Sequence, residues 1–237
     1  MNTDTDSDTP TDKRSYAQER FSGPPGATEI LLVRHGASQT YVPGEPFPML
    51  GPQGDPALSP IGREQAKLVG ARLSGEPVDA VYVTRLQRTV ETAQPFLDAD
   101  GLTAVVSPHL HEVFLGEWEG GLSRIKMAEA TDPIALEVMK RGTWDVVPGA
   151  EPFEEFSGRC RAGIEEIAAA HPGGNVVAVV HGGVIGVLAR LTVGAGGRVG
   201  PVENCSITHL VVTEDRWILK SFNDTAHLGG LFTDTHS

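Results

Sequence analysis

The chain has 237 residues, 40% of them apolar, which is enough for one large domain with a substantial hydrophobic core. Its formal net charge of −12 argues against nucleic acid or an anionic membrane surface as the main partner, because both would repel it. The two cysteines, Cys160 and Cys205, are too few for a disulfide framework in a chain of this length and favour a reducing, cytoplasmic setting.

The N-terminal segment, residues 1–28, is rich in Thr, Asp, Ser, Pro and Gly. A segment of this composition cannot bury enough apolar area to offset the entropy lost on ordering. It has no apolar stretch of signal-peptide type, and no run along the chain approaches the roughly 20 apolar residues of a membrane span. The sequence therefore predicts a disordered tail over residues 1–28, a folded domain over 29–223, a C-terminal tail over 224–237, and no membrane partner.

A strand that ends in a histidine opens the predicted domain. Four aliphatic residues at 30–33 run directly into Arg34, His35 and Gly36, and a short apolar run of this kind suits a strand covered on both faces. Because ligands bind at the carboxyl ends of strands in open α/β sheets, we expect Arg34 and His35 at a binding rim. Residues 37–57, rich in proline and glycine, follow as a long irregular loop whose position favours a substrate-facing role.

A helix over residues 60–73 comes next, followed by a strand over 79–83 and a second helix over 85–97. The second helix carries Arg85 and Arg88 in its first turn, where arginine opposes the helix dipole. A bound anion would resolve this conflict, since helix N-termini and arginines both bind phosphate. For Arg88 a solvated surface position is the alternative on this evidence alone.

The remaining predicted elements are, in chain order, a strand at 103–107, a loop at 109–121, a helical segment at 123–141 broken at Pro133, a helix at 153–170, a strand at 176–180, a helix at 184–193 and strands at 206–212 and 216–222. The strand at 176–180 runs straight into His181 and Gly182, as the first strand runs into His35. If both strands lie in one parallel sheet, both imidazoles reach one rim. The pattern predicts an α/β fold, a three-layer α/β/α sandwich with a mostly parallel central sheet and a late antiparallel hairpin.

The candidate functional residues are His35, His181, Arg34, Arg88 and Glu112. Two neutral imidazoles and a carboxylate could bind zinc, but two arginines would repel a dication and suit a dianion instead. A histidine beside arginine-bound phosphate is a sensible nucleophile, because the arginines neutralise the phosphoryl oxygens while a ring nitrogen attacks in line. A nearby carboxyl can then protonate the leaving oxygen.

At these residues the sequence resembles the histidine phosphatase superfamily, the group that includes the cofactor-dependent phosphoglycerate mutases. The resemblance covers roughly residues 29–212 and is centred on the Arg-His-Gly signature at 34–36. Further segments similar to those of the family follow in the family's order, at 58–66, 84–93, 110–120, 180–183 and 204–207. A tripeptide alone occurs by chance, whereas several segments in the right order form a specific signal.

The resemblance implies that His35 is phosphorylated and that water then attacks the phosphohistidine. It implies that Glu112 is the general acid and then the general base, although Glu117 and Glu119 stand nearby. The groups that would hold the phosphoryl group and the substrate are, by the same resemblance, Arg34, Arg88, His181 and Gly182. The partner implied is a small phosphorylated molecule, and no metal or organic cofactor is implied.

Departures from the mutase pattern favour a phosphatase. Mutases typically follow the acid glutamate with Arg-His-Tyr, whereas this chain has an apolar run at 113–115, and its loop at 37–54 contains no basic residue. A mutase must hold its intermediate while the product reorients, and this requires charged groups on the substrate to which the enzyme can bind. We therefore predict hydrolysis of a phosphomonoester whose leaving group has hydrophobic character. A phosphoglycerate mutase and a non-catalytic phospho-ligand binding module are the alternatives, and a homodimer stays open.

Overall fold

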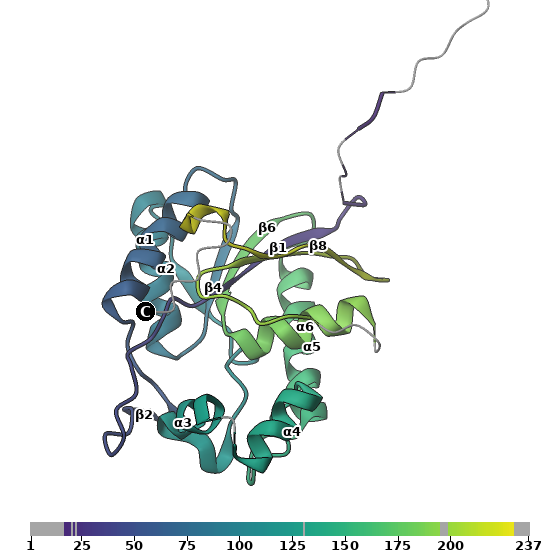
Figure 1. Cartoon of the computed structure of the whole chain (residues 1–237). Coiled ribbons are helices and arrows are strands. Elements are labelled where there is room, and N and C mark those ends of the chain that lie inside the picture. Colours follow the sequence, from purple (N-terminus) through teal and green to yellow (C-terminus); the bar gives the residue numbers. More distant parts are fainter. Residues whose placement is uncertain (1–16, 20, 22, 130, 195–198, 230–237) are drawn as a thin grey trace, which may run out of the picture.

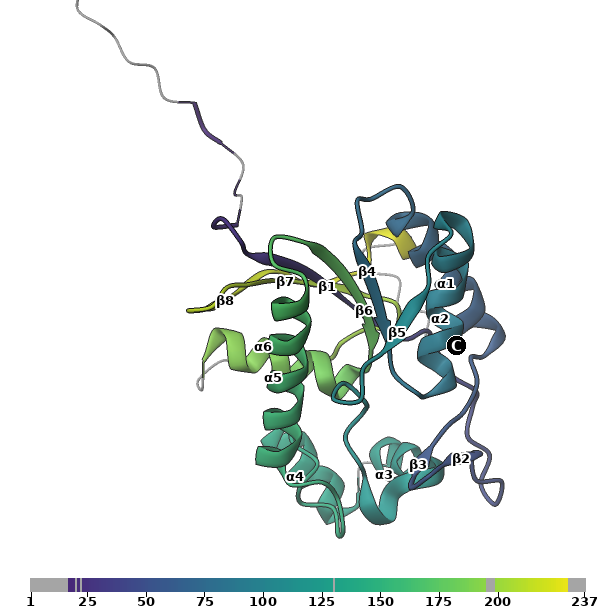
Figure 2. The same ribbon diagram turned by 180° about the vertical axis from the view of Figure 1, so that it is seen from behind.

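The computed structural model describes residues 17–19, 21, 23–129, 131–194 and 199–229, so most of the predicted N-terminal tail and the end of the C-terminal tail lie outside it. The central element is a six-stranded sheet with the order β5-β4-β6-β1-β7-β8 (Figures 1 and 2). Its strands are β1 (Thr28–Arg34), β4 (Ala80–Val83), β5 (Ala104–Val106), β6 (Asn175–Val180), β7 (Ile207–Val212) and β8 (Trp217–Asp224). The first four strands in the sheet order are parallel, and β7 pairs antiparallel with both β1 and β8.

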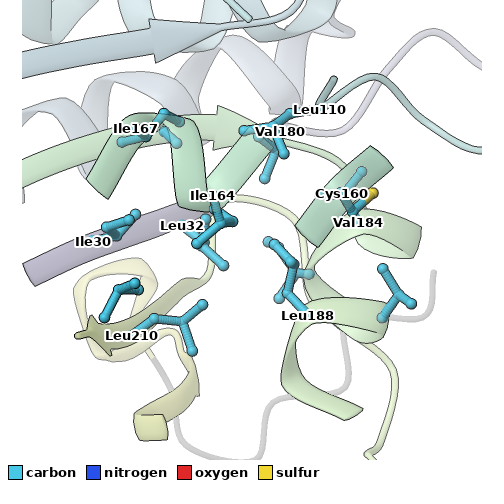
Figure 3. Close-up of a cluster of buried hydrophobic side chains, with 14 of the residues drawn as sticks. Ile30, Leu32, Leu110, Cys160, Ile164, Ile167, Val180, Val184, Leu188 and Leu210 are labelled. Atoms are coloured by element: carbon cyan, nitrogen blue, oxygen red, sulfur yellow. The ribbon is translucent and has the colours of Figure 1, made fainter. Parts of the chain in front are cut away.

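Helices cover both faces of this sheet, which confirms the predicted three-layer α/β/α fold. One layer contains α1 (Pro60–Leu73) and α2 (Gln87–Asp100), and the other contains α5 (Phe153–Ala170) and α6 (Gly182–Val193). Side chains alternate along β1, so that Ile30 and Leu32 pack toward α5 and α6 while Val33 packs toward α1 and α2. Figure 3 shows the larger of these two apolar clusters. Burial on both faces explains the near-continuous apolar runs of β1 and β6.

The pairing of β1 with β6 brings the two His-Gly segments to one edge of the sheet. The strands are parallel, with Arg34 opposite Val180, and the backbone N–H of His35 donates to the carbonyl oxygen of Val180 over 3.0 Å. The next residue after Val180 is His181. Both imidazoles therefore leave the sheet at its carboxyl edge, as the sequence predicted.

Smaller elements lie beyond that edge (Figures 1 and 2). They are the hairpin β2 (Met49–Leu50) and β3 (Gln53–Gly54), the 3-10 segment η1 (Gly116–Gly121), α3 (Leu122–Glu129) and α4 (Pro133–Arg141). The break at Pro133 is as predicted, and the carboxylate of Asp132 caps α4 by accepting from Ile134 N over 2.9 Å. The loop at 37–57 was predicted to be irregular throughout, and its short hairpin is a correction, because two-residue strands leave no detectable alternation.

Two helix starts also differ from the predictions. Helix α2 begins at Gln87, so Arg85 precedes it and is exposed, whereas Arg88 stays in the first turn. Helix α6 begins at Gly182, two residues earlier than predicted, with His181 at its N-cap. Within the predicted C-terminal tail, residues Ala226–Leu228 form the 3-10 turn η2. No helix in the described ranges is both long and apolar enough to cross a bilayer.

The backbone that leaves β1 is packed against the start of α1 through two glycines. A Cβ on Gly36 would lie 2.6 Å from the carbonyl oxygen of Gly62, and a Cβ on Gly62 would lie 1.9 Å from the carbonyl oxygen of Ala37. Hydrogen bonds fasten the same contact, because Ser59 N and Oγ donate to Ala37 O over 2.8 and 3.0 Å. The side-chain oxygen of Gln65 accepts from Ala37 N over 2.9 Å. The start of α1 thus fixes the loop that follows His35.

We expect Gly62→Ala to lower the free energy of unfolding by about 3 kcal/mol, because its Cβ would force the backbone apart. Gly158→Ala is the matched control, since Gly158 is exposed on α5 and no heavy atom lies within 4 Å of the point that its Cβ would occupy. That control should raise the free energy of unfolding by about 0.5–1 kcal/mol. Urea denaturation measures both changes, and a Gly62→Ala protein as stable as the wild type would contradict the packing argument.

Candidate active site

His35 presents one ring nitrogen with a free lone pair to the site. The residue is only 7% exposed, and its Nδ1 lies 2.8 Å from the carbonyl oxygen of Gly36. Because a carbonyl oxygen can only accept, Nδ1 carries the proton and Nε2 holds the lone pair. The backbone is held as well, since Asn204 Nδ2 donates to the carbonyl oxygen of His35 over 2.8 Å.

His181 packs edge-on against His35, with ring centroids 5.2 Å apart and an interplanar angle of 61°. It is fully buried, and its Nε2 lies 3.0 Å from the hydroxyl of Thr84 at the end of β4. Thr84 is held in turn by Thr89 of α2, whose hydroxyl lies 3.1 Å from that of Thr84. Within the described ranges, Nδ1 of His181 has no hydrogen-bond partner. This ring therefore keeps one nitrogen available to a ligand.

Burial and neighbouring positive charge keep both imidazoles neutral. Burial lowers the pKa of His35 well below 6.5, and the charges of Arg88 and Arg34 lower it further. The pKa of His181 is lowered well below 6.5 by the same two causes, with burial again the larger and Arg88 next. A neutral His35 is the form that can act as a nucleophile.

Two guanidinium groups flank His35, one from the buried Arg88 and one from the partly buried Arg34. Arg88 is 8% exposed, donates from Nη1 to the carbonyl oxygen of Gly54 over 3.1 Å, and lies 4.0 Å from Asp55. Arg34 donates from Nη1 to the carbonyl oxygen of Val202. Its Nε is buried and lacks a partner among the residues that the structure describes. Both groups thus keep donors free for an anion.

A third guanidinium, which the sequence analysis missed, reaches the site from α3. Arg124 donates to Gln39 O over 2.9 Å and to the hydroxyl of Ser38 over 2.6 Å, and it lies over the ring of Phe47 at 5.0 Å. Its charge is one of those that lower the pKa of His35. The loop at 37–54 has no basic residue of its own, but α3 supplies one to it. A lone arginine in a helix gives no sequence signal for this placement.

Glu112 is held at the start of α6. Its Oε2 accepts from Gly183 N over 3.2 Å, and its Oε1 accepts from Val113 N over 3.0 Å. A Cβ on Gly183 would lie 2.3 Å from Oε1, so this approach requires glycine. Gly183 is a second residue that the sequence analysis did not place in the site, because its role is visible only once the carboxylate is positioned.

The neighbouring carboxylates lie in other environments. Glu117 is exposed, and Glu151 forms a close ion pair with Arg159, with an Nε–Oε1 distance of 2.6 Å. Glu119 reaches the site, but its two oxygens accept from Leu115 N and Gly54 N, each over 2.9 Å. Glu119 therefore fastens the hairpin to η1.

These groups surround a cavity of about 360 Å³, which Arg34, His35, Arg88 and Glu112 all line. The other two predicted residues lie just behind this wall. His181 packs against His35, and a Cβ on Gly182 would lie 3.3 Å from Arg34 Nε. In the described part of the chain, no group of three or more His, Cys, Asp or Glu side chains is arranged to hold a metal ion. The arrangement of cations around a neutral imidazole suits a phosphoryl dianion.

Comparisons with known proteins agree with this arrangement. The model of the histidine phosphatase superfamily (branch 1) matches residues 30–225. A metal-independent phosphoserine phosphatase of Arabidopsis thaliana is 28% identical over 208 residues, which are 86% of this chain and 84% of the relative. Phosphoglycerate mutase-like protein 4 of the same plant is 30% identical over 205 residues, 84% of this chain and 86% of the relative. A mycobacterial glucosyl-3-phosphoglycerate phosphatase structure superimposes with a TM-score of 0.68 at 26% identity, covering 84% of this chain and 100% of that one.

The neutral imidazoles predict a loss of stability in acid. Because the pKa of His35 and of His181 is lowered in the folded protein, the unfolded chain binds more protons once the pH falls below about 6.5. The free energy of unfolding therefore does not depend on these two histidines' titration above that pH. Below it, the free energy of unfolding falls by about 1.4 kcal/mol per pH unit for each histidine. Urea denaturation between pH 7.5 and 5 measures the slope.

His181→Gln should reduce this slope by the share of one histidine, and His35→Asn is a second variant with the same expectation. His109→Gln is the control, because His109 is partly exposed at the protein surface, with its side chain 43% accessible. An unchanged slope in both site variants would show that neither imidazole is held neutral by the fold.

Proposed function

The chain belongs to the histidine phosphatase superfamily, and we propose that it hydrolyses a phosphomonoester through a phosphohistidine formed on His35. The observation that carries this proposal is a neutral imidazole, with its lone pair on Nε2, in a cavity that Arg34, Arg88 and Arg124 also line. The names of the relatives, which include a phosphoserine phosphatase and a glucosyl-3-phosphoglycerate phosphatase, support the same chemistry.

In the first step Arg34 and Arg88 bind the equatorial phosphoryl oxygens, and His181 donates from Nδ1 to one of them. Nε2 of His35 attacks phosphorus as the bond to the leaving oxygen breaks, and Glu112 gives that oxygen a proton. The positive charge that develops on His35 is stabilised by the hydrogen bond from Nδ1 to Gly36 O. The products of this step are the alcohol and phosphohistidine.

In the second step water attacks the phosphohistidine. The Glu112 carboxylate accepts a proton from that water, the P–N bond breaks, and His35 returns to its neutral form. The guanidinium groups neutralise the same oxygens in both steps, which is the electrostatic work that a metal ion performs in other phosphatases. We therefore expect turnover without added metal.

A phosphoglycerate mutase is the second candidate, and Arg124 is the observation that favours it. This third guanidinium could hold a substrate carboxylate beside the phosphoryl group. Against it, Val113 and Leu115 place apolar side chains in the cavity where the mutase pattern has charged or polar ones. Interconversion of 2- and 3-phosphoglycerate that outpaces phosphate release would favour the mutase, and a bound phosphate ester that never turns over would favour a binding module.

The substrate that fits this proposal is a small phosphorylated molecule, because His35 is buried in a cavity of limited size. Both cysteines are free and buried, which is in keeping with a reducing, cytoplasmic setting. The strongly negative net charge opposes binding to nucleic acid. A homodimer remains a prediction for analytical ultracentrifugation.

We expect His35→Ala to lower kcat/KM for an aryl phosphate by at least about 10³-fold, because the covalent route is lost. Wild-type turnover should persist in EDTA, and His109→Ala should leave it unchanged. Rapid quenching should trap a base-stable, acid-labile phosphoryl group on the wild type and none on His35→Ala. Full activity in His35→Ala, or wild-type turnover abolished by EDTA, would overturn the proposal.

We expect Glu112→Gln to lower kcat for an alkyl phosphate by about 10²–10⁴-fold, because an alkoxide leaves poorly without a proton. For p-nitrophenyl phosphate, whose leaving group needs no proton, the loss in the first step should be much smaller. A burst of p-nitrophenol separates that step from the hydrolysis of the phosphoenzyme. Glu117→Gln is the matched control on an exposed carboxylate. Equal losses in the first step for both substrates would remove Glu112 from the role of acid.

A further inference from the structure

A second cavity, of about 620 Å³, adjoins the phosphoryl site. The two cavities share part of their walls, because Arg34, Glu112, Val113, Leu115 and Trp144 line both. We call the second cavity the side chamber. Its size falls within the range of roughly 300–1,000 Å³ that is typical of pockets for organic ligands.

The side chamber has largely apolar walls. The side chains that α3, α4, α5 and α6 contribute to it include Met127, Val138, Met139, Phe153, Phe156 and Val187. Besides Arg34, two arginines line it, but each is engaged with another group. Arg141 pairs with Glu137 over 2.7 Å, and Arg190 donates to Gly142 O over 2.9 Å. An occupant therefore needs apolar surface more than a compensating charge.

Glu112 lies on the boundary between the two cavities. A general acid must reach the oxygen that joins phosphorus to the leaving group, so it stands where the dianion ends and the alcohol begins. Arg88 and Arg124 line only the phosphoryl cavity, whereas the side chains that line only the side chamber are mainly apolar. This order matches the order of groups in a phosphate ester of an apolar alcohol.

We propose that the side chamber holds the leaving group and that the preferred substrates are phosphomonoesters of bulky, mainly apolar alcohols. This inference rests on the proposed function, because it places the leaving group from the position of the acid. A three-carbon alcohol would fill only a small part of a chamber of this size, whereas a longer alkyl or a ring-containing alcohol would bury its surface there.

Gly186 gives direct experimental access to the side chamber. It lies on α6 and lines the chamber, and no heavy atom lies within 4 Å of the point where a Cβ would be. A side chain at this position would therefore enter the chamber without a backbone clash. Gly158 on α5 has the same open surroundings but is exposed and lies outside the chamber, so it provides the matched control.

The first test compares ethyl phosphate with n-hexyl phosphate, whose alcohols differ little in acidity. We expect kcat/KM of the wild type to rise by about 4-fold for each added CH₂, or about 250-fold over the four CH₂ groups that separate the two esters. Equal kcat/KM for the two esters would overturn the proposal. Failure of the proposed function is a separate outcome, in which neither ester is hydrolysed and no phosphohistidine forms with an aryl phosphate.

The second test fills the side chamber. We expect Gly186→Phe to lower kcat/KM for hexyl phosphate at least 10-fold, because the hexyl chain can no longer be buried in the side chamber. The kcat/KM for ethyl phosphate should change less than about 2-fold. Gly158→Phe should leave both esters unchanged. If Gly186→Phe does not fold, as judged by circular dichroism, Gly186→Leu is used in its place. Equal losses for both esters, or none for either, would overturn the assignment of the chamber.

Discussion

The parallel pairing of β1 with β6 is the constraint on which the rest of the site depends. It sets Arg34 opposite Val180, so that His35 and His181, which follow them, leave the sheet side by side with their rings 5.2 Å apart. A shift of one residue would turn alternate side chains to the wrong face of the sheet. Because apolar clusters are buried on both faces, such a shift is opposed by the whole core. The hydrophobic layers thus fix the distance between two polar rings.

That geometry also decides the protonation of the site. Burial and nearby guanidinium groups lower the pKa of both histidines, so the positive charge rests on the arginines and not on the imidazoles. The charge of Glu112 acts on both arginines and that of Asp55 on Arg88, while Nε of Arg34 has no hydrogen-bond partner among the described residues. A neutral nucleophile is thereby combined with an electrostatic site for a dianion. Neither property would survive if the rings were exposed to solvent.

The sequence predicts the parts of this structure that contiguous residues encode. Arg34, His35 and His181 end apolar strands, and the rule for parallel sheets then places them at one edge. The start of α2 could be placed only to within two residues, because tertiary hydrogen bonds hold the preceding turn: Thr84 Oγ1 bonds to Nε2 of His181, and Gln87 N donates to Oδ1 of Asp55. The approaches of Arg124 and Gly183 to the site could not be predicted at all. Each depends on a contact between elements that only the folded chain brings together.

Helix α6 links the chemistry to the choice of substrate. His181 forms its N-cap, Gly183 in its first turn donates to Glu112, and Gly186 one turn later faces the side chamber. Glycine at 183 is what allows the carboxylate to approach the helix start, and this approach puts Glu112, the proposed acid, at the junction of the two cavities. A larger residue there would displace Glu112 from the leaving oxygen and from the chamber together. In the proposed mechanism, the identity of that residue therefore affects both proton transfer and the fit of the alcohol through a single contact.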